Sequence, residues 1–166
     1  PELLPAWTDY ASLLHRLDAD GNRVRLATVP AGERVNWTVQ PGQTYVITQG
    51  AKKPVTPPPG EIPQPGPGEH VVILPDTQAH LDAARAYLAR FYPDVNFKPD
   101  EAVGRWPYVT IIGSTGGVTA AQEAALRNAG AWVERVAGAT LADTKTLLDG
   151  LAATGNRFLK GAPEPP

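Results

Sequence analysis

The sequence predicts two modules: a small all-β sheet or part of a β-sandwich on the N-terminal side, and a three-layer α/β domain with a parallel sheet on the C-terminal side. Three observations predict this fold class. Short stretches of β-type alternation fill the first 50 residues, proline and glycine dominate the next 19, and apolar strands then alternate with helical periodicity. The predicted boundaries are a β-rich module at 1–50, a linker at 51–69, an α/β domain at 70–160 and a tail at 161–166.

The β-rich module is predicted to be a meander of four strands. Asp20-Gly21 and Pro41-Gly42 are turn sequences that favour hairpins between such strands. A sheet of about 50 residues buries little surface by itself, so one of its faces requires cover from another part of the protein. The expected strands are 10–17, 23–29, 34–39 and 44–48.

Four aromatic residues of this module allow two interpretations. Their flat faces could stack on sugar rings, or they could pack in the core. Core packing is favoured, because large aromatic side chains are mostly buried. The four are Trp7, Tyr10, Trp37 and Tyr45.

The segment 51–69 is predicted to be an extended, semi-rigid linker. It contains seven prolines and three glycines, all between Pro54 and Gly68. Proline in this density prevents both helix and sheet formation, and it favours extended spacers between modules. The shift in composition therefore marks a domain boundary.

The first half of the α/β domain begins with an apolar strand at 70–74. Pro75-Asp76-Thr77 then starts a helix, which apolar residues at helical spacing continue until Pro93 ends it. A looser stretch at 94–107 holds a short extended piece at 95–97. A second apolar strand is expected at 109–112, followed by a glycine-rich turn.

The second half repeats the alternation of strand and helix. Thr119 and Gln122 have the spacing of a capping box, and Gly130 stands where a left-handed residue ends a helix. A strand follows at 131–136. Thr140 and Asp143 cap the last helix, which ends near Gly155. Such alternation predicts a parallel sheet with right-handed crossovers.

Turns that follow parallel strands gather at one edge of the sheet, where ligands of α/β proteins bind. Three turns are expected there, each opening onto a helix N-terminus with free amide groups. A phosphate, a carboxylate or sugar hydroxyls would fit such groups. The candidate ligand-binding residues are Asp76, Thr77, Ser114, Thr115, Gly116, Gly117 and Thr140.

The sequence does not predict catalysis. The chain has no cysteine, its three histidines lie on different segments, and no pair of carboxylates stands out. Ser114 with His80 as its base lacks a third, orienting group. A dinucleotide site is disfavoured because the last fingerprint glycine is missing and Glu134 falls inside a strand. We therefore expect no catalytic residue, no cofactor and no metal ligand.

Charge and hydropathy exclude two classes of partner. The chain has 15 Lys and Arg against 17 Asp and Glu, and neither half carries the basic patch that nucleic acid requires. No run of residues approaches the ~18 apolar residues of a membrane span. The 166 residues include no methionine, so we expect this chain to be part of a longer polypeptide.

Residues 108–119 and 123–139 carry a resemblance to a known family. Their sequences are YVTIIGSTGGVT and EAALRNAGAWVERVAGA. They resemble the second type of cell-wall-binding repeat found in bacterial surface-layer proteins and secreted hydrolases. The similarity covers about residues 70–152. It implies a strand–helix order like the one above, and a non-catalytic domain that attaches to an anionic wall polymer.

The chain departs from that family in two ways. The family's repeats usually occur in threes around a common axis, whereas this chain has one unit. The polar segment that follows Gly-Ala in the family is replaced here by 140–144, TLADT, so its role is not carried over. Association of three copies in place of the tandem array is a hypothesis, which a monomer in light scattering would contradict.

The residues and the resemblance together predict a non-catalytic accessory region of an extracellular or cell-surface protein of a bacterium or phage. It would attach to a wall or surface polysaccharide, or serve assembly with further copies or with a neighbouring domain. Two alternatives stay open. One is a small α/β domain that binds a nucleotide or a phosphorylated ligand at the 113–119 turn. The other is a structural C-terminal part of a larger secreted glycosidase or peptidoglycan hydrolase.

Overall fold

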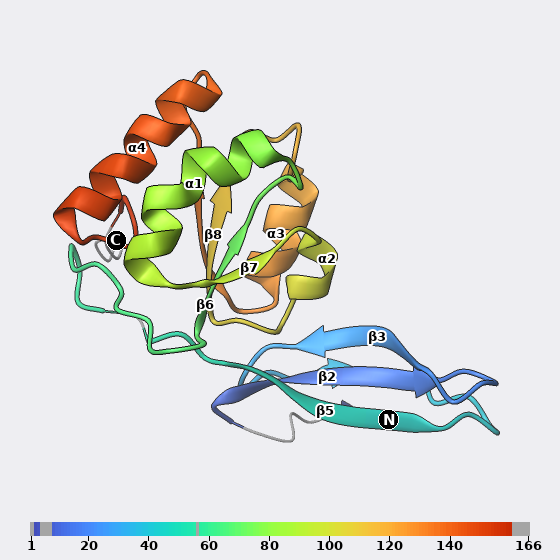
Figure 1. Cartoon of the computed structure of the whole chain (residues 1–166). Coiled ribbons are helices and arrows are strands. Elements are labelled where there is room, and N and C mark those ends of the chain that lie inside the picture. Colours follow the sequence, from blue (N-terminus) through green and yellow to red (C-terminus); the bar gives the residue numbers. More distant parts are fainter. Residues whose placement is uncertain (1, 4–7, 56, 161–166) are drawn as a thin grey trace.

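The computed structural model describes residues 2–3, 8–55 and 57–160. It confirms the predicted fold class, with an antiparallel β-sheet on the N-terminal side and a parallel sheet with helices on the C-terminal side (Figure 1). Trp7 and the predicted tail at 161–166 lie outside the described residues.

The N-terminal sheet has three strands, with β2 (Tyr10–Leu17) in the centre. The strands β3 (Arg23–Val29) and β5 (Tyr45–Lys52) pair antiparallel with β2 on its two sides. A separate two-residue ribbon joins β4 (Val35–Asn36) to β1 (Glu2–Leu3). Strands occur in all four predicted segments, but the predicted meander is wrong: 34–39 forms only the short strand β4 outside this sheet, and β5 pairs with β2. Tyr10, Trp37 and Tyr45 are all partly buried.

The C-terminal sheet is parallel, with strand order β7-β6-β8-β9. Its strands are β7 (Asp94–Asn96), β6 (His70–Ile73), β8 (Tyr108–Ile112) and β9 (Trp132–Val136). The helices are α1 (Gln78–Phe91), α2 (Pro99–Ala102), α3 (Ala120–Asn128) and α4 (Leu141–Thr154).

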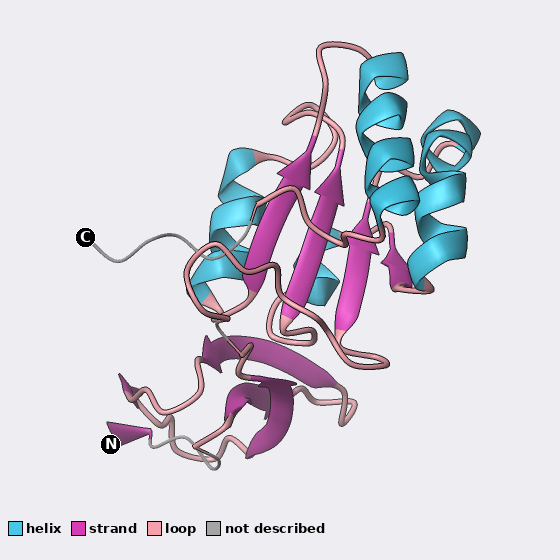
Figure 2. Cartoon of the chain, turned by 90° about the vertical axis from the view of Figure 1, so that its left-hand side faces the viewer, coloured by secondary structure: helices cyan, strands magenta, loops and turns pink. Residues whose placement is uncertain are grey.

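Alternate residues of each strand face opposite layers of helices, so the domain has three layers. Val72 and Ile112 pack with Tyr87 of α1 and Leu148 of α4 in one fully buried cluster. On the other face, strand residues pack against Leu126 of α3 and Ala102 of α2. Figure 2 shows helices on both sides of the sheet.

The β-module packs directly against the loop between α2 and β8. The amide of Ala51 donates to the carbonyl oxygen of Gly104 at 2.6 Å, and Nη1 of Arg25 donates to that of Val103 at 2.5 Å. A Cβ atom on Gly104 would lie 2.7 Å from Cγ2 of Thr28, so the side chain of Thr28 packs against the backbone of Gly104 more closely than another residue there would allow. This contact joins the small sheet to the α/β domain.

The proline-rich segment also packs in part on the α/β domain. Pro63 and Pro65 are buried. The phenol oxygen of Tyr108 accepts from the amide of Val55 at 2.9 Å and donates to its carbonyl at 3.1 Å. In Figure 2 the parallel strands point away from the β-module, so their carboxyl ends lie at the far end of the molecule.

Candidate functional site

The three turns named from the sequence follow β6, β8 and β9 at the carboxyl edge of the parallel sheet. The chain passes from β6 to β7 on one side and continues to β8 and β9 on the other, so the strand order reverses between β6 and β8. Ligands of open α/β sheets bind at such a reversal. The predicted residues therefore lie where this topology places ligand sites.

Two of these turns touch each other. A Cβ atom on Gly117 would lie 2.6 Å from Cγ of Pro75, and one on Gly113 would lie 3.5 Å from Nε2 of His80. Gly113 also has a φ of 103°, which only glycine adopts at little cost. The amide of Gly113 donates to the carbonyl of Val136 at 3.0 Å, which links the third turn to the same edge.

Ser114 accepts hydrogen bonds from three backbone amides of the glycine-rich turn. Its hydroxyl accepts from the amide of Gly116 at 3.4 Å, and its carbonyl accepts from the amides of Gly117 at 3.1 Å and Val118 at 3.4 Å. Ser114, Thr115 and the two glycines are exposed. Because three amides of the turn already have acceptors inside it, those amides are not available to cradle an anion.

Asp76, Thr77 and Thr140 are exposed at the starts of α1 and α4. The hydroxyl of Thr77 pairs with Nδ1 of His80 at 2.7 Å and accepts from the same residue's amide at 3.3 Å. Thr140 and Asp143 form a capping box, with bonds of 3.1 and 2.9 Å. The structure brings the predicted residues to one edge, and there both threonine hydroxyls serve their own helices.

Arg135 of β9 holds the glycine-rich turn in place by hydrogen bonds. The sequence analysis did not assign this residue a role. Its Nη1 and Nη2 donate to the carbonyls of Gly113 at 2.8 Å and Val118 at 2.7 Å, and its Nε donates to Glu123 at 2.8 Å. The side chain is only 15% exposed. The available signal was a pair of charged residues, Glu134 and Arg135, inside a buried strand. Arg135 fixes both ends of the glycine-rich turn to the sheet.

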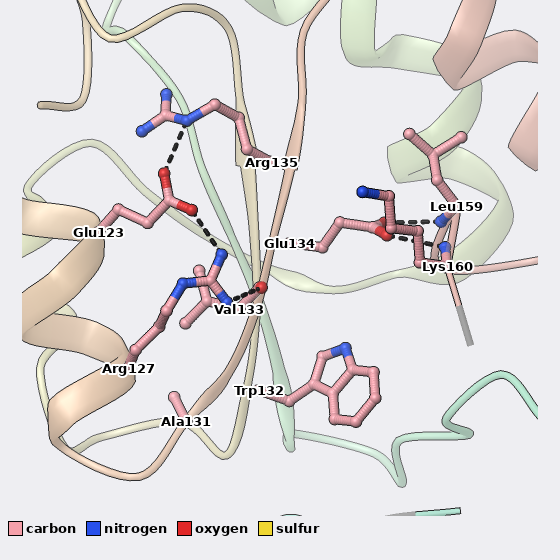
Figure 3. Close-up of a pocket in the computed structure, with 9 residues that line it drawn as sticks. All are labelled: Glu123, Arg127, Ala131, Trp132, Val133, Glu134, Arg135, Leu159 and Lys160. Atoms are coloured by element: carbon pink, nitrogen blue, oxygen red, sulfur yellow. Dashed lines mark hydrogen bonds and ion pairs between the residues drawn. The ribbon is translucent and has the colours of Figure 1, made fainter. Parts of the chain in front are cut away.

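A cleft lies along β9, the strand at the edge of the sheet (Figure 3). Its volume is about 710 Å³, which falls within the range of ligand sites in proteins. Residues of α3, of β9 and of the last described segment form its walls. They are Glu123, Arg127, Ala131, Trp132, Val133, Glu134, Arg135, Leu159 and Lys160.

The free edge of β9 forms the floor of this cleft. The amide of Trp132 donates to the carbonyl of Pro107, just before β8. At the other end of β9, the carbonyl of Val136 accepts from the amide of Gly113. Backbone groups of a strand alternate in direction, so those of Val133 and Arg135 face away from β8. Arg127 caps one of them, since its Nη1 donates to the carbonyl of Val133 at 2.6 Å.

Glu134 holds the last described segment at the cleft. Its two carboxylate oxygens accept from the amides of Leu159 at 2.6 Å and Lys160 at 2.8 Å. The residue is 8% exposed, and burial raises the pKa of its carboxyl group even though the two amides act in the opposite direction. Phe158, which is fully buried, inserts beside His70 and anchors the same segment.

The acids of the cleft are engaged, whereas one of its cations is not. Glu123 bonds Arg127 at 2.5 Å and Arg135 at 2.8 Å. Burial alone would raise the pKa of Glu123, but the two arginines bring it below its ordinary value. Among the described residues, no hydrogen bond or ion pair engages the Lys160 ammonium or the Trp132 indole N–H.

Two further results concern the part of the chain that the structure describes. It contains no group of three or more histidine, aspartate or glutamate side chains that could hold a metal ion. It also contains no helix with the length and apolar character needed to cross a bilayer. Comparison of the chain with protein-family models, with curated proteins and with solved structures found no match in any of the three.

Proposed function

We propose that this chain is a non-catalytic accessory region of an extracellular bacterial or phage protein, and that it attaches that protein to a wall or surface polysaccharide. The observation that carries the proposal is the solvent-open cleft on the flank of the sheet, along β9. It combines an aromatic ring with charged side chains, which together suit a sugar's apolar face and its polar groups.

The state of the carboxyl edge supports the same function. Enzymes and nucleotide-binding proteins of this architecture use that edge for their ligands. Here Ser114 holds the amides of its own turn, and Thr77 and Thr140 cap their own helices. The hydroxyl groups of these three residues are therefore engaged within the protein.

The junction of the modules supports a role in attachment. The bonds of Ala51 and Arg25 to the loop at Val103 and Gly104 join the β-module to the α/β domain at the amino end of the parallel strands. A partner bound on the flank of the domain would therefore be held at a fixed position relative to the β-module.

Sedimentation of the full chain with purified bacterial cell walls tests this proposal. We expect the chain to pellet with the walls and to be released by an excess of the soluble wall polysaccharide. An unrelated protein of similar size and net charge controls for trapping. A chain that stays in the supernatant with walls of every type tried would refute the function.

A thermal-shift panel of nucleotides and phosphorylated sugars separates this function from the small-ligand alternative. A ligand that binds only the native state raises the melting temperature. We expect no shift with any member of the panel. A shift that is lost in Ser114→Ala would favour a ligand site in the glycine-rich turn.

A further inference from the structure

We infer that the cleft along β9 is a binding site for an anionic sugar unit, a pyranose that bears a carboxylate or a phosphate. In this site the ring stacks on Trp132 and the acid group binds the ammonium of Lys160. The inference rests on the proposed attachment function for the kind of ligand. The site itself and the charge of the ligand follow from the geometry of the cleft.

Trp132 supplies the surface on which a sugar would lie. Its side chain is partly buried, so the ring is held in place while part of it reaches the cleft. An indole offers a flat apolar face and one N–H donor at its rim. No acceptor for that N–H occurs among the described residues, so it is available to a sugar hydroxyl.

Lys160 supplies the charge. Its side chain is exposed, but its backbone amide is tied to Glu134 at 2.8 Å, so the flexible stem starts from a fixed point on the wall of the cleft. The side chain makes no ion pair among the described residues, although its charge opposes the rise that burial causes in the pKa of the nearby Glu134. An ammonium without an ion-pair partner among the described residues, on the same side of β9 as the indole (Figure 3), is suited to a ligand that carries an acid group.

The balance of charge in the cleft favours an anion. The cleft is lined by two acids, Glu123 and Glu134, and by three cations, Arg127, Arg135 and Lys160, with Lys160 on the opposite side of β9 from the two arginines (Figure 3). Both acids already accept hydrogen bonds, from arginine and from backbone amides. Arg127 is half exposed and has N–H groups beyond those bonded to Val133 and Glu123, so it adds positive charge to the cleft.

Calorimetric titration of the full chain tests the inference with three probes: an oligogalacturonate, a poly(glycerol phosphate) oligomer and a neutral dextran oligomer. We expect one or both of the anionic probes to bind, with an affinity that falls as salt is added, and dextran not to bind. The two anionic arms separate a carboxylate ligand from a phosphate ligand. Equal binding of dextran would overturn the charge assignment.

Three substitutions place the ligand. Lys160→Gln removes the charge and keeps the backbone bond to Glu134, so we expect affinity to fall about tenfold. Trp132→Ala removes the platform and should weaken binding at least as much, whereas Trp132→Phe should restore most of it. Lys145→Gln, which changes an exposed lysine paired with Asp149 on α4, is the matched control. Unchanged affinity in Lys160→Gln and in Trp132→Ala, with native circular dichroism, would overturn the site.

The experiment separates this inference from the proposed function. If the chain pellets with walls and no defined sugar binds, the site assignment fails and attachment stands. If an anionic sugar binds and the cleft variants weaken it, the site stands even where no wall pellets the chain.

Discussion

At the scale of single residues, His70 is the clearest case of a polar group confined by burial. Its ring is 2% exposed, Nε2 bonds the hydroxyl of Thr110 at 2.9 Å, and Phe158 packs against it with 5.3 Å between ring centroids. Burial, with the nearby charge of Arg157, lowers the pKa of His70 to about 3. The imidazole is therefore neutral in the folded protein across the physiological pH range.

His70 should make the folded state sensitive to acid. The pKa of His70 is about 3 in the folded protein and 6.5 in the unfolded chain. Between pH 3 and 6.5 the imidazole is therefore protonated in the unfolded chain and neutral in the folded protein. The contribution of the neutral imidazole to the free energy of unfolding is fully present above pH 6.5 and is lost as the pH falls toward 3. By pH 4.5 this loss is about 2 kcal/mol.

Urea unfolding at pH 7 and 4.5 measures this effect against two variants. When the pH is lowered from 7 to 4.5, we expect the free energy of unfolding to fall by about 2 kcal/mol less in His70→Gln than in the parent chain. His80→Gln, at the carboxyl edge, should follow the parent. A loss in His70→Gln equal to that of the parent would contradict the assignment.

Arg135 should contribute to stability through its geometry as well as its charge. It bonds two carbonyls and one carboxylate at once, and a lysine ammonium cannot match that planar arrangement. We expect Arg135→Lys to reduce the free energy of unfolding by about 2 kcal/mol. Arg85→Lys, at an exposed ion pair on α1, should change it by no more than about 0.5 kcal/mol. Equal effects in urea denaturation would show that the fastening of the turn matters little.

At the scale of elements, the helix ends followed from local sequence. Thr119 with Gln122 and Thr140 with Asp143 form the predicted capping boxes, and Gly155 adopts the left-handed conformation that ends α4. Each of these features depends on residues within four positions of one another. They are therefore readable without knowledge of the rest of the fold.

The cap of α4 should be measurable by itself. Thr140→Ala removes the hydroxyl that accepts from the amide of Asp143, and we expect a loss of about 1 kcal/mol in the free energy of unfolding. Thr140→Ser keeps a hydroxyl and should lose only a few tenths of that amount. Two variants of equal stability would mean that Thr140 does not cap the helix in solution.

Strand partners and the cleft depended on contacts that the sequence does not encode locally. The 34–39 segment has β-forming residues, but propensity does not select a partner, and only Val35–Asn36 pairs, with β1. The bonds of Glu134 to Leu159 and Lys160 span 25 and 26 residues. A strand pattern places Glu134 in β9, but only the return of the chain after α4 creates the wall of the cleft.

At the scale of the whole molecule, the junction of the two modules depends on Gly104. Its φ is 72°, and a Cβ atom there would lie 2.7 Å from Thr28 and 2.9 Å from Leu13 of the β-module. Conformation and space both require glycine. Even a methyl side chain at position 104 should therefore destabilise the junction.

Gly104→Ala is expected to destabilise the protein by more than about 2 kcal/mol, from strained backbone and overpacking together. Gly42→Ala is the matched control, because Gly42 has a φ of 75° and a Cβ atom added there would meet nothing within 4 Å. Gly42→Ala should reduce the free energy of unfolding only by the cost of placing alanine at a positive φ, about 1 kcal/mol. Equal losses in thermal or urea unfolding would mean that the two modules do not press together at this loop.

The central claim is that the flank along β9, and not the carboxyl edge, is the binding surface. Amide chemical-shift mapping tests it on the isotope-labelled full chain, whose mass is 17.6 kDa, during titration with the anionic oligosaccharide that binds most tightly. We predict the largest shifts at the indole N–H of Trp132 and at the amides of Leu159 and Lys160. Shifts confined to the turn from Ser114 to Gly117, or no shifts at saturating sugar, would contradict the claim.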